Sequence, residues 1–168
     1  PICNDFVFAG GGADWIETSD GDDVVYLTQG ALWEDSKIDG GTGSNTLAFI
    51  NPGESGGWDF SVYGAVSIDI SNLGAASNFQ NIVGSTSDDV IVGNDQSNVI
   101  IGNSGGDTID GGDGDDILHG DFNVFDPSGI QFGLNSYYSS SQGDDVLRGG
   151  AGDDQLYGGG GNEDRKST

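Results

Sequence analysis

The sequence predicts an all-β solenoid, in which short strands follow one another along a coil and each coil stacks on the next. Three observations support this fold class. Glycines recur every nine residues, an aliphatic residue keeps one fixed place in each nine-residue unit, and a carboxylate or an amide keeps another. Internal periods of this kind are typical of repeat architectures, in which each unit buries its apolar side against its neighbours.

The clearest units lie between residues 84 and 119. They read GSTSDDVIV, GNDQSNVII, GNSGGDTID and GGDGDDILH, and each begins with a glycine nine residues after the last. Their sixth position holds a carboxylate or an amide: Asp89, Asn98, Asp107 and Asp116. Their eighth position holds an aliphatic residue: Ile91, Ile100, Ile109 and Leu118. A disordered acidic linker has no reason to keep two residue types in phase, so a folded repeat is favoured over a linker.

The same frame continues toward the C-terminus after an interruption. Residues 122–141 are inserted into one unit, which QGDDVLR then completes with Gly143 and Asp145. The next unit, GGAGDDQLY, follows in phase with Asp154 in the sixth position. The last unit, GGGGNEDRK, places Arg165 where the aliphatic residue belongs. We therefore expect the last unit to be a cap or a truncated end of the array.

Upstream, AGGGADWIE and TSDGDDVVY fit the frame through Asp14 and Asp23, and Asp5 belongs to a partial unit before them. Residues 27–39 slip out of phase, and GGTGSNTLA then restores the frame with Asn45 in the sixth position. The frame is therefore present on both sides of the chain's centre.

The frame is lost in the centre, where WDFSVYGAVSIDISNL alternates like an ordinary pair of strands. The sequence thus predicts an N-terminal repeat array at 1–48, a connecting β segment at 49–83, and a C-terminal array at 84–168 that carries the inserted loop 122–141.

Each unit combines a turn with a strand. Glycines in the first positions permit a tight turn, and the last three residues form a very short strand whose eighth residue points inward. Two units then make one coil, so turns on the same edge recur every eighteen residues. Allowing for the insertion, this spacing pairs four sets of side chains: Asp89 with Asp107, Asn98 with Asp116, Asp107 with Asp145, and Asp116 with Asp154.

Paired carboxylates between stacked turns predict a cation. The turns also expose backbone carbonyl oxygens, and flexible anionic sites made only of oxygen suit calcium, which takes about 6–8 oxygen ligands. Magnesium prefers a stricter octahedron, and zinc would need His or Cys, of which the chain has one each. The expected cofactor is Ca2+, at roughly four to seven ions.

The units GGDGDDILH and GGAGDDQLY resemble the haemolysin-type nonapeptide of RTX proteins, G-G-x-G-x-D-x-U-x. The resemblance implies a right-handed parallel β-roll with calcium between successive turns, shared by sixth-position side chains and backbone carbonyls. It also implies an extracellular protein exported from a Gram-negative bacterium by a type I secretion system. By this resemblance the metal-binding positions are Asp5, Asp14, Asp23, Asn45, Asp89, Asn98, Gly102, Gly105, Asp107, Gly111, Asp113, Gly114, Asp116, Gly143, Asp145, Gly149, Ala151, Gly152 and Asp154.

Some units depart from the pattern. Ser87 and Gln96 replace the fourth glycine, Ser36 replaces an aspartate, and Asn45 and Asn98 are uncharged. Calcium sites built on those turns should be weaker or absent, because fewer carboxylates face the ion.

Composition excludes several partners. The chain has 28 acidic and 4 basic residues, a net charge of −24, which disfavours nucleic acid and anionic membrane surfaces. No apolar run approaches a membrane span, and Cys3, the single cysteine, cannot form an intramolecular disulfide. We expect a monomer, and PICNDFVFAG lacks a basic start and reads as part of a longer protein.

Two further functions compete with that of a calcium-binding module. The first is an extracellular polysaccharide-binding or adhesion module attached to a carbohydrate-active enzyme or adhesin. The ligand would bind the segment 58–70 or the insertion 122–141, whose aromatic residues either pack against the roll or recognise a ligand. An enzyme is disfavoured, because the carboxylate pairs recur at many equivalent positions whereas an active site is built once. His119, at a ninth position, is expected to be an inert surface residue, and Trp15, at a seventh position, is expected to face outward.

Overall fold

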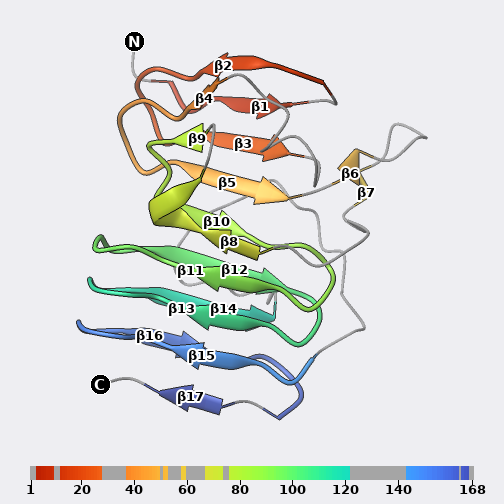
Figure 1. Ribbon diagram of the computed structural model, residues 1–168, viewed down its shortest axis with the longest axis vertical. Helices are drawn as coiled ribbons and strands as arrows, with labels where there is room; N and C mark the ends of the chain where they lie inside the picture. The colour runs from red at the N-terminus through yellow and green to blue at the C-terminus, as the bar shows by residue number, and fades with distance from the viewer. Residues whose placement is uncertain are drawn as a thin grey trace.

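The computed structural model describes residues 3–9, 12–27, 37–49, 51–52, 58–59, 67–73, 76–121, 143–162 and 164–166. These residues form short strands that stack along the long axis of the molecule, with the two termini at opposite ends (Figure 1). The insertion 122–141 and residues 28–36 lie outside the described part, so the predictions made for them stay predictions.

One face of the stack is a parallel sheet of seven strands. Its strands in spatial order are β1 (Phe6–Phe8), β3 (Val24–Leu27), β5 (Thr46–Phe49), β10 (Asn81–Val83), β12 (Val99–Asn103), β14 (Ile117–Asp121) and β16 (Gln155–Tyr157).

The opposite face consists of two parallel sheets. One contains β2 (Trp15–Glu17), β4 (Lys37–Asp39) and β9 (Ala76–Ser77). The other contains β8 (Ser67–Asp69), β11 (Val90–Val92), β13 (Thr108–Asp110), β15 (Val146–Arg148) and β17 (Asp164–Lys166). Successive strands of the repeat arrays thus alternate between the two faces, as expected for a parallel β-roll.

The strand register confirms that two units make one coil. Ile91 pairs with Ile109, and Ile100 with Leu118, in each case eighteen residues apart. The insertion leaves this register intact, since Leu118 pairs with Leu156 across it. The strands are short because each run of aliphatic or β-branched residues is bounded by glycine-rich turns.

The core is a row of eighth-position side chains between the two faces. In the C-terminal array its members are fully buried: Ile91, Ile100, Ile109, Leu118 and Leu147. Leu156 is partly buried and packs against them. Beyond it, Arg165 takes the register position opposite Leu147, as predicted for a capping unit, and is exposed.

The centre of the chain differs in part from the alternating strands predicted for it. β7 (Trp58–Asp59) pairs antiparallel with β6 (Asn51–Pro52), while β8 joins the roll. Residues Ile70–Asn72 form a 3-10 turn, because the Asp69 side chain accepts a hydrogen bond from the Ser71 N–H and ends the strand. The seven-stranded sheet passes through this region, since β5 pairs directly with β10. The domain limits at 48 and 83 stay predictions.

The prediction that His119 lies on the surface is wrong. Only 3% of the residue is exposed, because its ring stacks on that of Tyr157 at 4.7 Å and its strand lies between those of Tyr157 and Ile101. Trp15, in contrast, faces outward as predicted and is 69% exposed.

Candidate metal centre

The sixth-position side chains form two ladders along the edges of the roll. The first ladder follows the turns that lead into the seven-stranded sheet, and the second follows the turns that lead into the opposite face. Along the second edge, Asp107 Oδ1 accepts the Asp89 N–H at 2.8 Å, and Asp145 Oδ1 accepts the Asp107 N–H at 2.8 Å. Each side chain therefore bonds to the main chain of the preceding coil.

The first edge repeats this geometry from one end of the roll to the other. Its hydrogen bonds join Asp5 N to Asp23 Oδ1, Asp23 N to Asn45 Oδ1, Asn98 N to Asp116 Oδ1, and Asp116 N to Asp154 Oδ1, at 2.8–3.2 Å. All four predicted pairs of sixth-position side chains are therefore brought together.

The second oxygen of several ladder carboxylates is buried without a hydrogen-bond partner. This is true of the Oδ2 atoms of Asp23, Asp107, Asp116 and Asp154. A buried carboxylate oxygen without a donor destabilises a fold unless a cation compensates it. These oxygens therefore mark positions that a cation would stabilise.

Glycine makes room for these oxygens. A Cβ added at Gly102 would collide with Asp107 Oδ2 and with the Gly120 carbonyl oxygen of the next coil. A Cβ at Gly111 would likewise collide with Asp116 Oδ2 and the Gly149 carbonyl oxygen. A carboxylate oxygen and a carbonyl oxygen thus lie on the same side of both of these first-position glycines.

The electrostatics of the ladders are unfavourable without a cation. Burial raises the pKa of Asp107 to about 8, and the charges of Asp89, Asp145 and Asp121 add to the rise, against the lowering effect of the Asp89 N–H. Burial also raises the pKa of Asp116 to about 6, with a further contribution from Asp154. Both carboxyl groups resist ionisation because they lie among other carboxylates away from water.

The donor set fits calcium. In the described residues no three His, Cys, Asp or Glu side chains converge closely enough to hold a metal by themselves. Each ion would therefore be shared by ladder carboxylates and glycine carbonyls, a set made only of oxygen. Zinc sites of Cys and His have no counterpart in these turns.

The remaining predicted positions lie in the same turns. Gly105 and Gly114 have φ angles of 110° and 112°, and Gly152 has a φ of 144°, conformations that side chains rarely adopt. Asp113 and Ala151 form an isolated parallel bridge between stacked turns, and both are exposed.

Three further predicted positions complete the set. Asp5 is exposed and Asp14 half-buried, at the N-terminal end of the roll. A Cβ added at Gly143, on the second edge, would collide with the Gly105 carbonyl oxygen. The assignment of all the predicted positions as metal ligands stays a prediction.

The sequence interpretation missed the role of the fifth-position carboxylates. Asp22 Oδ1 accepts the Ser44 N–H at 2.8 Å, Asp115 Oδ1 accepts the Asp153 N–H at 2.9 Å, and Asp144 Oδ1 accepts the Asn162 N–H at 2.8 Å. These exposed side chains bond to the following coil, whereas the sixth-position side chains bond to the preceding one. The recurring Asp-Asp pair in the sequence could have indicated this role, because the two aspartates join one turn to the turns of both neighbouring coils.

Asp89 also differs from the other ladder carboxylates. Its Oδ2 accepts the Ser85 N–H at 2.6 Å, and its Oδ1 accepts the Ser85 hydroxyl at 2.7 Å. Serine in the second position, in place of glycine, therefore gives this carboxylate hydrogen bonds within its own turn.

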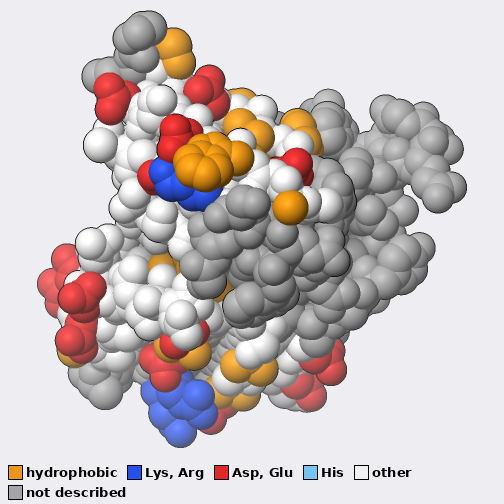
Figure 2. Space-filling view, turned by 45° about the horizontal axis from the view of Figure 1, so that its top comes forward, with side chains coloured by type: hydrophobic (Ala, Val, Ile, Leu, Met, Phe, Trp, Pro, Cys, Tyr) orange, Lys and Arg blue, Asp and Glu red, His pale blue; other side chains and the backbone are white. Residues whose placement is uncertain are grey.

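The charged surface is mostly acidic. On the face shown in Figure 2, Asp and Glu side chains are spread over the molecule, while Lys and Arg gather in separate places. Across the described parts of the chain, no helix is long and apolar enough to span a membrane. Cys3 is exposed.

Comparison with known families agrees with this geometry. The family model of the RTX calcium-binding nonapeptide repeat matches four copies, at residues 4–31, 80–107, 92–123 and 139–163, which together cover more than half of the chain. No match was found among curated proteins. Repeats of this family bind calcium and are not catalytic. The chain therefore belongs to the RTX calcium-binding nonapeptide-repeat family.

Proposed function

We propose that this calcium-binding roll folds when it binds extracellular Ca2+, and that folding supports the export and stability of a larger secreted protein. The observation that supports this proposal is the set of buried Oδ2 atoms in the ladders, four of which have no hydrogen-bond partner. Without a cation, each of them opposes folding.

The carboxylates that would hold calcium are those whose Oδ2 atoms are buried in the turns: Asp23, Asp107, Asp116, Asp145 and Asp154. The carbonyl oxygens of Gly120 and Gly149 lie beside two of them and would complete the oxygen shell. Bound calcium supplies positive charge and accepts these oxygens as ligands. Since the unfolded chain does not bring the turns together, the chain binds calcium tightly only when folded.

The stabilisation follows from this linkage. A ligand that binds only the folded form adds about 2.7 kcal/mol per site at a hundredfold excess over its Kd. With roughly four to seven sites, the sum can exceed the usual domain stability of about 5–15 kcal/mol. Carboxylate repulsion then keeps the chain unfolded at low cytosolic calcium, and the roll condenses outside the cell.

The remaining parts of the proposal concern the cellular context. An unfolded acidic chain can be threaded through a type I secretion system of a Gram-negative bacterium, and it would fold on arrival outside. We propose that the chain acts as a monomer and does not catalyse a reaction. An extracellular polysaccharide is a second proposed partner, whose predicted surfaces at 58–70 and 122–141 lie largely outside the described residues.

Far-ultraviolet circular dichroism during a calcium titration tests the proposal. Starting from chelator, β-structure should increase sharply with calcium, while magnesium at the same concentrations should have little effect. A full β spectrum already present in chelator would show that the aliphatic core suffices, and would refute calcium-dependent folding.

A further inference from the structure

We propose that the roll contains a middle section that needs no calcium, consisting of residues 37–49 and 76–83 on β4, β5, β9 and β10. In this section, amide groups and one lysine of the chain itself take the role that the ion has in the repeats before residue 28 and after residue 83. The inference rests on the proposed function and limits it to part of the molecule.

The turn before β5 shows the substitution directly. A Cβ at Gly40 would meet the Asn78 carbonyl oxygen and Asn45 Nδ2, whereas at Gly102 it would meet the Gly120 carbonyl oxygen and Asp107 Oδ2. The Asn45 amide nitrogen therefore lies in the place of the carboxylate oxygen. It donates a hydrogen bond to that carbonyl, Asn78 O, at 3.0 Å. A direct N–H···O bond at Gly40 thus takes the place of the two oxygens that face Gly102 and that a cation would join.

The neighbouring rungs of the first edge are also amides. Asn45 N–H donates to Gln80 Oε1 at 2.8 Å, and Asn98 Nδ2 donates to the Gln80 carbonyl at 2.8 Å. Asn81 Nδ2 donates to Ser44 Oγ at 3.0 Å. Amides both donate and accept, so these rungs are satisfied without an ion.

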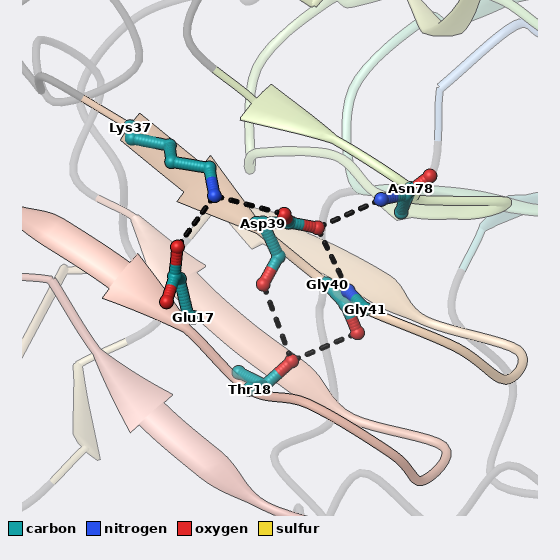
Figure 3. Close-up of polar contacts among 7 residues, drawn as sticks. All are labelled: Glu17, Thr18, Lys37, Asp39, Gly40, Gly41 and Asn78. Carbon is teal, nitrogen blue, oxygen red and sulfur yellow. Dashed lines mark hydrogen bonds and ion pairs between the residues drawn. The ribbon is translucent and has the colours of Figure 1, made fainter.

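Around β4, the chain supplies its own positive charge. The Lys37 ammonium contacts Glu17 Oε1 at 2.5 Å and Asp39 Oδ2 at 3.0 Å (Figure 3). Asp39 Oδ1 accepts hydrogen bonds from Asn78 Nδ2 at 2.7 Å and from the Gly41 N–H at 3.0 Å. Both oxygens of Asp39 thus have donors from the protein, whereas several ladder carboxylates have an Oδ2 atom without a donor.

The titration of these groups agrees with this contrast. The hydrogen bonds from Asn78, Gly41 and Lys37 lower the pKa of Asp39 to about 2. Its charge is thus stabilised by the protein, whereas Asp107 Oδ2 is buried without a hydrogen-bond partner. The middle section contains an ionised carboxylate that the protein already compensates.

The core is also thicker here. The buried cluster includes the two phenylalanines Phe49 and Phe79, together with Ile70 and Leu73 from the adjoining 3-10 turn. In the C-terminal array the core is a row of single aliphatic side chains. More apolar area leaves water in the middle section, so hydrophobic burial there contributes more to stability. We therefore expect the middle section to stay folded at calcium concentrations that leave the repeats before residue 28 and after residue 83 unfolded.

Hydrogen–deuterium exchange with mass spectrometry tests this on the full chain in EGTA and in calcium. The amides of Gly40, Gln80 and Asn81 donate to carbonyl oxygens inside the section, Gly40 to Ser77 and the other two to Asn45, and they should exchange at least about 100-fold more slowly than an unstructured chain in both buffers. Amides of β11, β13 and β15 should be protected only in calcium.

The outcomes separate the two proposals. If no segment is protected in EGTA, the middle section does not exist and calcium-dependent folding stands. If the whole chain is protected in EGTA, calcium-dependent folding is refuted, and the middle section with it as a distinct unit.

The variant Asn45→Asp tests the substitution itself, because it restores a carboxylate to the Gly40 turn. Protection of the Gln80 and Asn81 amides, which both donate to the Asn45 carbonyl, should be lost in EGTA and recovered in calcium. Thr42→Asp is the matched control, since it adds the same charge at an exposed position of the same turn, whose side chain bonds outside the section to Asp20, and it should keep protection in both buffers. Protection of Asn45→Asp in EGTA, or its loss in both buffers, would refute the claim that the amide takes the place of the ion.

Discussion

Replacing Asp107 by asparagine should change stability in opposite directions with and without calcium. The Asp107 side chain is fully buried, its Oδ1 accepts the Asp89 N–H at 2.8 Å, and its Oδ2 has no hydrogen-bond partner. Asparagine keeps the Oδ1 acceptor and replaces Oδ2 with an uncharged NH2 group. The substitution thus removes the charge and leaves the ladder hydrogen bond in place.

The magnitudes follow from the two roles of the charge. In calcium, loss of one site removes about 2.7 kcal/mol at a hundredfold excess of ion over its Kd. In chelator at pH 7, a pKa raised from 3.8 to about 8 corresponds to a destabilisation on the order of 4 kcal/mol, which the asparagine variant no longer carries. Asp107→Asn should therefore be less stable than the wild type in calcium and more stable in chelator.

Urea unfolding in millimolar calcium measures the loss of stability in the calcium-bound state. Folding induced by trimethylamine N-oxide in EGTA measures the gain of stability without calcium, because this osmolyte favours burial. Asp115→Asn is the matched control in the neighbouring unit, since Asp115 is exposed and its Oδ1 bonds to the Asp153 N–H. We expect it to change stability by less than about 0.5 kcal/mol in either buffer. Equal destabilisation of Asp107→Asn in both buffers would show that the carboxylate is only a hydrogen-bond acceptor, and would refute the reasoning.

Two other predictions follow from the turns. In chelator, β-structure should increase as the pH falls from about 8 to about 4, because the folded pKa values of Asp107 and Asp116, about 8 and about 6, lie above the unfolded value. The contribution of these two groups to folding stability is complete below the unfolded pKa and is lost as the pH rises through the folded pKa. Circular dichroism that shows less β-structure at pH 5 than at pH 8 would contradict this. Gly111→Ala should destabilise the calcium-bound roll by about 1–3 kcal/mol in thermal unfolding, because its Cβ would overlap Asp116 Oδ2 and the Gly149 carbonyl. Gly106→Ala, whose Cβ would lie 3.1 Å from the nearest atom, should have a smaller effect, and equal losses would argue against a tight cradle at Gly111.

The period of the sequence was enough to predict the coil and its ladders. Residues eighteen apart, such as Asp89 and Asp107, meet because a parallel stack places equivalent positions of successive coils side by side. The eighth-position core followed from strand alternation alone. Even the insertion 122–141 did not disturb these predictions, because Ile109 and Leu147 still pair across it.

The features that could not be predicted depend on contacts that do not recur from one repeat unit to the next. Nothing in the repeat indicated that His119 would be covered, since its burial depends on stacking with Tyr157 and on Ile101 in the next strand. The Lys37 contacts with Glu17 and Asp39 escaped notice because residues 27–39 slip out of phase and hide the pairing of β2 with β4. The 3-10 turn at Ile70–Asn72 depends on a single capping side chain, Asp69.

A crystal structure of the calcium-loaded chain, with long-wavelength anomalous scattering to locate the ions, tests the central claim most directly. We predict anomalous peaks at about 2.3–2.6 Å from the Oδ2 atoms of Asp107, Asp116 and Asp154. No peak is predicted beside Asn45, whose amide nitrogen already bonds to the Asn78 carbonyl. Ladder carboxylates without ions, or ions bound instead at the exposed fifth-position aspartates, would contradict the account.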